Sequence, residues 1–183
     1  MKSEVVREIL DWAKHIAIAV IVGILFVTFV GQRTIVYGVS MTPTLHDGDQ
    51  LFIEKITPKI GQLKRGDIVT IYVHGMLDEG KDYLIKRVIA VEGDRISIHD
   101  GKVFVNGVEL HENYVSVDYT YSERLTSEIT VGENKVFVMG DNRTRGGSND
   151  SRTLGEFDVS SVRGRAIFRW YPFDSIGPLG RGR

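Results

Sequence analysis

The sequence predicts a mainly β protein: a folded, barrel-like antiparallel sheet that follows one N-terminal transmembrane helix. Two observations lead to this class. After residue 34, short runs rich in β-branched and aromatic residues recur, and turn-forming pairs such as Asp100-Gly101 and Asn106-Gly107 separate them. Before them, residues 16–31 read IAIAVIVGILFVTFVG and carry no charge. No long stretch with 3.6-residue periodicity follows, so a helical soluble domain is not predicted.

The apolar run is the first element along the chain. Extended back to Trp12 it has 20 residues, enough at about 1.5 Å per residue to cross the ~30 Å hydrocarbon core. Lys14 is its only charge, and a long lysine side chain can reach the interface. A cleavable secretory signal fits less well, because residues 29–33 (FVGQR) lack small residues at both positions of a cleavage site. A buried globular helix would show a polar face, and none appears. The run therefore predicts an uncleaved anchor.

Basic residues around the run predict its orientation. Lys2, Arg7 and Lys14 precede the apolar core, whereas Arg33 alone follows it closely. Because the cytoplasmic side of a span carries the excess of Lys and Arg, the N-terminus is expected in the cytoplasm. The chain would then be a single-pass protein of the cytoplasmic membrane, with everything after about residue 33 outside.

Three parts of the chain are predicted: residues 1–33 as cytoplasmic N-terminus and anchor, 34–175 as the β domain, and 176–183 as a tail. Turn signals divide the domain into runs that read as strands. These are Gln50–Glu54, Asp67–Val73, Tyr83–Val91, Arg95–His99, Lys102–Val105, Lys135–Met139 and Arg165–Trp170. Residues 95–105 are a predicted hairpin, and the polar stretch of about 106–134 is a small excursion between core strands. The glycine-rich tail is expected to be mobile.

Composition excludes several classes of function. Lys and Arg number 23 against 24 Asp and Glu, so no basic excess points to nucleic acid as a partner. The chain has no cysteine, which removes disulfides, cysteine catalysis and thiolate metal sites. Its five histidines form no HxxxH or HxH cluster. We therefore expect no metal and no cofactor; the oligomeric state is not indicated.

Lys86 is a candidate general base. In a strand over residues 83–91, Leu84, Lys86, Val88 and Ala90 share one face, so Lys86 is a lone cation among apolar side chains. Burial disfavours the ammonium form and lowers a lysine pKa, which makes the neutral amine available near pH 7–8. The other reading is an edge strand that carries Lys86 as a charge against aggregation. The segment by itself favours that second reading slightly.

Ser40 is a candidate nucleophile, because it lies shortly after the apolar run in the sequence YGVSMTPTL. A serine hydroxyl needs a base before it can attack, and Ser40 could equally be an ordinary turn residue. Residues 138–152 follow a predicted strand and are dense in turn formers, hydroxyls and alternating charges. They fit a hydrogen-bonded loop that supports a site, or a polar surface loop.

Four motifs stand behind the apolar run. They are GVSMTPTL at 38–45, RGDIV at 65–69, YLIKRVIAVEGD at 83–94 and GDNR…SNDSR at 140–152. On these motifs the chain resembles the type I signal peptidases (leader peptidases), in the short single-anchor form typical of Gram-positive bacteria. One motif would be weak evidence, whereas four in the same order over nearly the whole chain are specific.

The resemblance implies a role for each matching residue. Ser40 matches the nucleophile, Lys86 the general base, and Ser148 the loop serine that hydrogen-bonds and orients this base. The oxyanion hole would use the Ser40 backbone N–H. Some relatives add a hydroxyl two residues earlier, but that position is Gly38 here, so a second donor would have to come from elsewhere.

Further residues are implied as support and as substrate contacts. Asp150 and Arg152 match a structural ion pair behind the site, and Asp141 and Arg87 are expected to form a second pair. The substrate is expected as an added strand beside residues 36–38 and 84–86. The expected substrate-binding residues are Val36, Tyr37, Gly38, Met41, Leu84 and Ile85.

The function that the resemblance implies is removal of N-terminal signal peptides from exported preproteins. Cleavage would follow small residues at −1 and −3, through an acyl-enzyme on a Ser-Lys dyad. The partners would be secretory preproteins and the lipid bilayer. Self-cleaving repressors of the SOS type share the dyad but begin with a DNA-binding helix-turn-helix in place of an apolar segment. The non-enzymatic alternative is a membrane-tethered β domain with a binding or scaffolding role.

Overall fold

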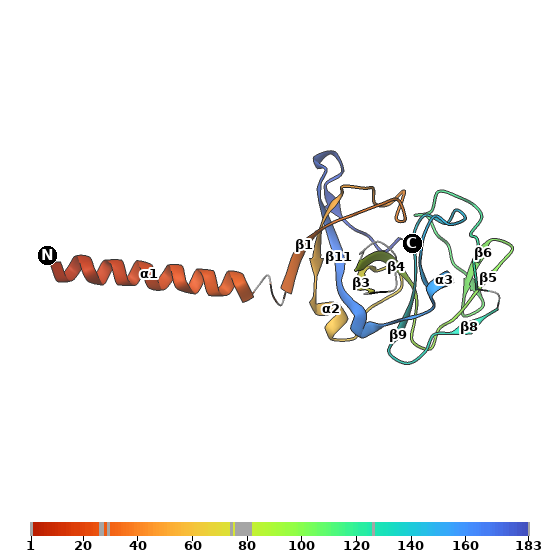
Figure 1. Cartoon of the computed structure of the whole chain (residues 1–183), viewed down its shortest axis with the longest axis horizontal. Coiled ribbons are helices and arrows are strands. Elements are labelled where there is room, and N and C mark those ends of the chain that lie inside the picture. The colour runs from red at the N-terminus through yellow and green to blue at the C-terminus, as the bar shows by residue number, and fades with distance from the viewer. Residues whose placement is uncertain are drawn as a thin grey trace.

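The computed structural model describes residues 2–25, 28, 30–73, 75, 82–125 and 127–182, and it is mainly β (Figure 1). One helix, α1, extends away from a body made of two antiparallel sheets. The helical segments are α1 (Lys2–Leu25), α2 (Ile56–Lys59), α3 (Ser151–Leu154), η2 (Val159–Ser161) and η3 (Phe173–Ser175). The strands of the larger sheet are β1 (Gly31–Ile35), β2 (Gln50–Glu54), β3 (Ile68–Tyr72), β4 (Tyr83–Val91), β9 (Lys135–Met139), β10 (Phe157–Asp158), β11 (Val162–Tyr171) and β12 (Gly177–Pro178). Those of the smaller sheet are β5 (Arg95–His99), β6 (Lys102–Val105), β7 (Val108–Glu109) and β8 (Ile129–Thr130).

The order of strands brings distant parts of the chain together. In the larger sheet it is β1-β2-β11-β3-β4-β9-β10, with β12 added to β11; in the smaller sheet it is β7-β6-β5-β8. Every pair is antiparallel. β4 lies inside the larger sheet, because β3 and β9 pair with it on its two sides.

The predicted fold class is confirmed in its β part. Five predicted strands have the predicted bounds, namely β2, β4, β5, β6 and β9. The predicted hairpin of residues 95–105 forms, and its turn uses positive φ at Asp100 (50°) and Gly101 (76°), as a two-residue hairpin turn requires. The sequence pattern missed β1 and the two-residue strands β7, β8, β10 and β12. β7 and β8 lie within the predicted excursion and complete the smaller sheet.

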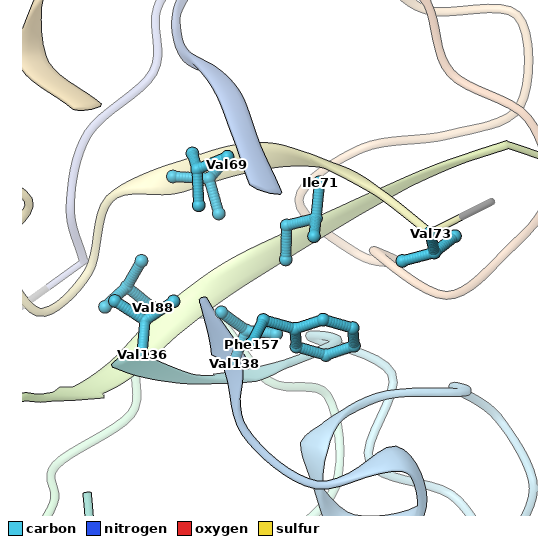
Figure 2. Packing of buried hydrophobic residues seen from close by; sticks show 8 residues of the cluster. Val69, Ile71, Val73, Val88, Val136, Val138 and Phe157 are labelled. Carbon is cyan, nitrogen blue, oxygen red and sulfur yellow. The ribbon is translucent and has the colours of Figure 1, made fainter. Parts of the chain in front are cut away.

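Three clusters of buried apolar side chains form the core. The first joins β3, β4, β9, β10 and β11, and Figure 2 shows it at close range. Its buried members are Val69, Ile71, Val73, Val88, Val136, Val138, Phe157 and Val162. The second cluster joins the two sheets through Ile89 and Phe137, and the third packs Val36 and Met41 against the β2 side. Burial of each such side chain contributes about 1.5–3 kcal/mol, so β4 is fixed on both faces.

β4 departs from regular alternation near its end. Its pairing with β9 shifts register between Val88 and Ala90. Before the shift Leu84 and Val88 pack in the first cluster, as predicted; after it, Ala90 packs in the second cluster and Val91 in the first. The predicted face of Ala90 is therefore wrong, because one extra residue in a strand inverts the alternation beyond it.

α1 covers the first part of the predicted anchor, and its described apolar side chains, such as Ile9 and Trp12, are exposed. Phe26, Val27 and Phe29 also belong to the predicted anchor and lie outside the described residues. Residues 31–33, which the sequence pattern assigned to the anchor, instead begin β1 and pair with β2. In the part of the chain that the structure describes, no helix combines the length and hydropathy needed to cross a membrane.

The tail makes specific contacts that its composition did not predict. β12 pairs with β11, and Leu179 packs against the third cluster. Arg181 donates to Asp67, with 2.6 Å between Nε and Oδ1. A glycine-rich segment can dock in this way because small residues allow close approach of its backbone to the body.

Candidate active site

Ser40 lies in a turn that backbone and side-chain hydrogen bonds hold in place. The N–H of Val36 donates to Asp49 O (2.8 Å), and the N–H of Gly38 donates to Asp47 Oδ1 (2.7 Å). Gly38 has a φ of 84°, a conformation that favours glycine. Val36 and Met41 are buried on either side of the turn, so the half-buried Ser40 is fixed at the border between core and solvent.

Lys86 of β4 contacts Ser40 directly. Its Nζ lies 2.7 Å from Ser40 Oγ and 2.9 Å from the carbonyl oxygen of Ile85. Lys86 pairs with Val69 of β3 and is only 2% exposed. The reading of Lys86 as a charge on an exposed edge is therefore wrong, and the structure brings together the two residues singled out from the sequence, 46 positions apart.

The surroundings of Lys86 favour its neutral form. Burial lowers its pKa from 10.5 to about 8, because the ammonium loses hydration. The carboxylates of Asp150 and Asp141 raise the pKa, and the guanidinium of Arg152 lowers it. Since burial is the largest effect, a substantial fraction of the lysine is neutral in mildly alkaline solution.

The loop of residues 140–152 packs against the Ser40 turn. The N–H of Asn142 donates to the carbonyl oxygen of Ser40 (3.1 Å), and its side-chain amide donates to Val39 O (3.2 Å). A Cβ atom on Gly140 would collide with Ser40 O and with Ser148 Oγ. A glycine at position 140 therefore permits this close approach.

Asp150 and Arg152 form the predicted ion pair, and both side chains are fully buried. Arg152 Nε and Nη2 donate to Asp150 at 2.9 and 2.8 Å. Burial by itself would raise the pKa of Asp150, but the hydrogen bonds and charge of Arg152 and the N–H of Gly140 hold this pKa below its usual range. The pair fixes the end of the loop, since Gly140 N donates to Asp150 Oδ2 at 2.9 Å.

Asp141 and Arg87 form the second predicted pair. Arg87 Nε and Nη2 donate to Asp141 at 2.9 and 2.6 Å, and both side chains are buried. Because Arg87 follows Lys86 in β4, this pair ties the strand of the lysine to the loop beside Ser40.

Ser148 differs from its expected role. It lies beside the site and is buried, but within the described residues its hydroxyl has no hydrogen-bond partner. It contributes to the lowered pKa of Asp150, although no contact of its hydroxyl with a described residue meets the geometry of a hydrogen bond. The implied hydrogen bond to Lys86 is therefore absent, since Lys86 Nζ donates instead to Ser40 and Ile85.

A groove of about 970 Å³ leads to the contact between Ser40 and Lys86. All six residues expected to bind substrate line it: Val36, Tyr37, Gly38, Met41, Leu84 and Ile85. The sequence pattern missed other lining residues, among them Thr34, Thr70, Tyr83 and Asn149. Thr34 and Thr70 come from sheet strands whose pairing with their neighbours was not predictable.

A third buried ion pair was also missed. Arg143 donates to Glu112 from both terminal nitrogens and to the carbonyl oxygen of Gly140 through Nε (2.7 Å). Arg143 is buried, and Glu112 comes from the excursion. The motif that contains Arg143 was visible in the sequence, but a single glutamate in a polar stretch gives no signal of its partner.

The arrangement can perform nucleophilic catalysis. A hydroxyl in contact with a buried amine of lowered pKa, at the base of a groove, has the parts of a serine hydrolase whose base is a lysine. Within the described ranges, no group of three His, Asp or Glu side chains is placed to hold a metal ion. A groove open to an extended chain suits a peptide substrate.

Comparisons with known proteins agree with this class. A family model for "Signal peptidase, peptidase S26" matches residues 9–171. Signal peptidase I of Bacillus licheniformis is 39% identical over 178 residues, which cover 93% of this chain and 92% of that protein. Signal peptidase I T of Bacillus subtilis (strain 168) is 38% identical, with coverage of 91% and 88%. A crystal structure of a signal peptidase I from Enterococcus faecalis V583 matches with a TM-score of 0.46 at 30% identity, covering 56% of this chain and 95% of that one.

The chain belongs to the signal peptidase family, peptidase S26, and with that family to the serine endopeptidases.

Proposed function

We propose that this chain removes N-terminal signal peptides from exported preproteins, with Ser40 as nucleophile and Lys86 as general base. The observation that carries the proposal is the 2.7 Å contact between Lys86 Nζ and Ser40 Oγ, with the lysine buried. A pKa of about 8 gives this lysine both a neutral fraction and a driving force to accept a proton.

In the first half of the reaction, neutral Lys86 takes the hydroxyl proton of Ser40 while Ser40 Oγ attacks the scissile carbonyl. The tetrahedral intermediate carries a negative oxygen, which the Ser40 backbone N–H would stabilise. In the described part of the chain this N–H donates to no other group, which supports its availability. Collapse of the intermediate breaks the C–N bond, and protonated Lys86 gives its proton to the leaving amine.

In the second half, water hydrolyses the acyl-enzyme. Lys86 is neutral again after the amine leaves, so it can take a proton from water as the hydroxide attacks the ester carbonyl. The signal peptide then leaves with a new carboxylate, and the proton returns to Ser40 Oγ. One buried lysine thus serves both halves, as histidine does in the Ser-His-Asp arrangement.

The substrate would lie as an added strand in the groove. The first half of β4, residues 83–86, pairs with β3 on one side, and within the described residues β9 pairs only with the second half, from Arg87 onward. Backbone groups of residues 83–86 are therefore open to an extended peptide. Val36, Met41 and Ile85 would form the shallow apolar pockets for small side chains at −1 and −3.

We further propose that the part of the chain before β1 anchors the enzyme in the cytoplasmic membrane, with the N-terminus inside and the β domain outside. The exposed apolar side chains of α1 support a membrane anchor. The basic residues before the uncharged run of residues 16–31 support its orientation. Because a preprotein is held at the membrane by its own apolar segment, an anchor would raise the effective concentration of enzyme and substrate.

The test is incubation of the full chain with a purified preprotein that carries an A-x-A site, followed by mass measurement of the products. We expect cleavage after the second alanine by the wild type and none by Ser40→Ala or Lys86→Ala. Lys102→Ala, which changes an exposed lysine of the smaller sheet, is the matched control and should cleave normally. Full cleavage by a folded Lys86→Ala variant would refute the mechanism, and failure of the wild type to cleave would favour the binding or scaffolding role.

A further inference from the structure

Residues 177–182, here named the strap, lie along β11 of the larger sheet, close to the Ser40 turn. β12 pairs with β11, and the N–H of Leu179 extends this pairing by donating to Ile167 O (3.0 Å). The Leu179 side chain packs against the third core cluster. That cluster contains Val36 and Met41, the two buried residues that flank the Ser40 turn, so the strap shares a core with the nucleophile.

Backbone carbonyl groups of the strap accept hydrogen bonds from a buried cation, the guanidinium of Arg87. Arg87 is 1% exposed, and its Nη1 donates to the carbonyl oxygens of Arg181 (3.1 Å) and Gly180 (3.4 Å) and of Gly66 (3.0 Å). Two of these three acceptors belong to the strap. A buried guanidinium that loses its acceptors must bind water or move. The strap therefore keeps this side of the Arg87 side chain buried and hydrogen-bonded to protein.

The other side of Arg87 connects the segments that carry the catalytic groups. Its Nε and Nη2 donate to Asp141, and Nη2 also donates to Thr44 Oγ1 (3.3 Å). Thr44 lies four residues beyond Ser40, Asp141 lies in the loop beside it, and Arg87 itself follows Lys86. One guanidinium thus joins the nucleophile turn, the base strand and the supporting loop.

Four further contacts surround Arg87 and the strap. Arg181 Nε donates to Asp67 Oδ1 (2.6 Å), and the backbone carbonyl of Asp67 accepts from the N–H of Val88 (2.8 Å). The Arg87 guanidinium also lies over the ring of Tyr114, 4.0 Å from its centroid. Gly182 packs so closely on this ring that a Cβ atom there would collide with it.

We propose that the strap is a positioning segment for catalysis: by enclosing Arg87 it holds the Ser40 turn, the Lys86 strand and the Asp141 loop in register. This inference rests on the proposed function of Ser40 and Lys86. It predicts a specific kinetic signature. Loss of the strap should misplace the nucleophile relative to its base, which lowers kcat, while the groove that binds the peptide, formed by residues 32–41 and 82–86 with the loop, remains.

The kinetic test compares the full chain with a chain that ends at Ile176 and with Arg181→Ala and Arg181→Lys. Arg95→Ala is the matched control, since it removes an exposed arginine from a pair with Glu128 of the smaller sheet's edge. Rates are expressed per folded molecule, with the folded fraction taken from circular dichroism. We expect kcat to fall about 100-fold in the shortened chain, as a misplacement near 1 Å would give, with KM changed less than about twofold. Arg181→Ala should show a smaller loss of kcat, and Arg181→Lys should restore part of it.

Wild-type kcat in both the shortened chain and Arg181→Ala would overturn the inference, as would a rise in KM at constant kcat. If the shortened chain does not fold, Arg181→Ala decides. A second readout does not depend on cleavage: amide hydrogen exchange in a Ser40→Ala background. Shortening should speed exchange of the Leu45, Val88 and Asn142 amides, which are hydrogen-bonded in the enclosed region, and leave the hairpin of residues 95–105 unchanged. Unchanged exchange at these three amides would refute the positioning role of the strap, even if the wild type cleaved no preprotein.

Discussion

Replacement of Lys86 by methionine tests whether burial lowers the pKa of the proposed base. Methionine is of similar length but has no charge, so Lys86→Met removes the titrating group and keeps most of the apolar packing. The lysine makes its contacts to Ser40 and Ile85 over 2.7 and 2.9 Å. Loss of these hydrogen bonds changes stability by a roughly constant amount, whereas loss of the titration changes how stability depends on pH.

The size of this dependence follows from the pKa. Its fall from 10.5 to about 8 on folding corresponds to about 3 kcal/mol, since one pKa unit is worth about 1.36 kcal/mol. Below pH 8 the lysine is protonated in both states, and the folded state carries the full cost of a dehydrated ammonium. Between about pH 8 and 10.5 the unfolded state binds more protons, so the stability of the wild type rises with pH. Above 10.5 both states are neutral and the cost is gone.

The assay is chemical denaturation of the full chain in detergent, for wild type and Lys86→Met, at intervals from pH 7 to pH 10. The free energy of unfolding of the wild type, relative to the variant, should rise by between about 2 and 3 kcal/mol over this range. Lys102→Met serves as control for the same change of residue type at an exposed lysine outside the site. A constant difference between wild type and Lys86→Met would refute a lowered pKa for Lys86, and with it a lysine base at neutral pH.

Three further changes test the surroundings of the dyad. Gly140→Ala should lower kcat by about 100-fold, because its Cβ would displace the carbonyl of Ser40 or the side chain of Ser148; wild-type kcat would show that the loop does not need this close approach. Ser148→Ala should leave the free energy of unfolding unchanged or raise it by up to about 1 kcal/mol, since its buried hydroxyl has no hydrogen-bond partner among the described residues; a loss of about 2 kcal/mol on denaturation would mean that a hydrogen bond is present. Arg152→Met should raise the pKa of Lys86, because it removes a nearby cation, and the pH profile of kcat/KM should move to higher pH; Arg152→Lys, which keeps the charge, should move it less.

The strands whose bounds the sequence predicted have four to nine residues, and each buries apolar side chains. β4 and β9 show long apolar runs because they cross the sheet between two core clusters. β1 was missed because its residues GQRTI directly follow the apolar run that was assigned to the anchor. The two-residue strands carry too few side chains for any period to appear. The contacts of the tail depend on backbone carbonyls, which no side-chain pattern reports.

The site was predictable where a residue type was unusual for its place. A lysine on an apolar face and a serine before Met-Thr-Pro stood out, and the four motifs in order supplied the rest. Contacts between segments far apart in the chain could not be predicted in this way. The fold brings Glu112 within hydrogen-bond distance of Arg143, and it brings the strap within hydrogen-bond distance of Arg87. Neither contact follows from a local sequence pattern, because the partners lie far apart in the chain. Ser148 shows the converse: a motif predicted a hydrogen bond that the local geometry does not form.

The charges around Lys86 explain why its burial can dominate. Two carboxylates face the lysine, and a free carboxylate beside an amine would stabilise the ammonium and make it a poor base. Here Asp141 is paired with Arg87 and Asp150 with Arg152, and all four side chains are buried. The charge of Arg152 offsets part of the effect of these carboxylates, and the two carboxylates raise the pKa of Lys86 less than burial lowers it. On this view the ion pairs do more than brace the loop: they allow two acids to lie near the base while its pKa stays at about 8.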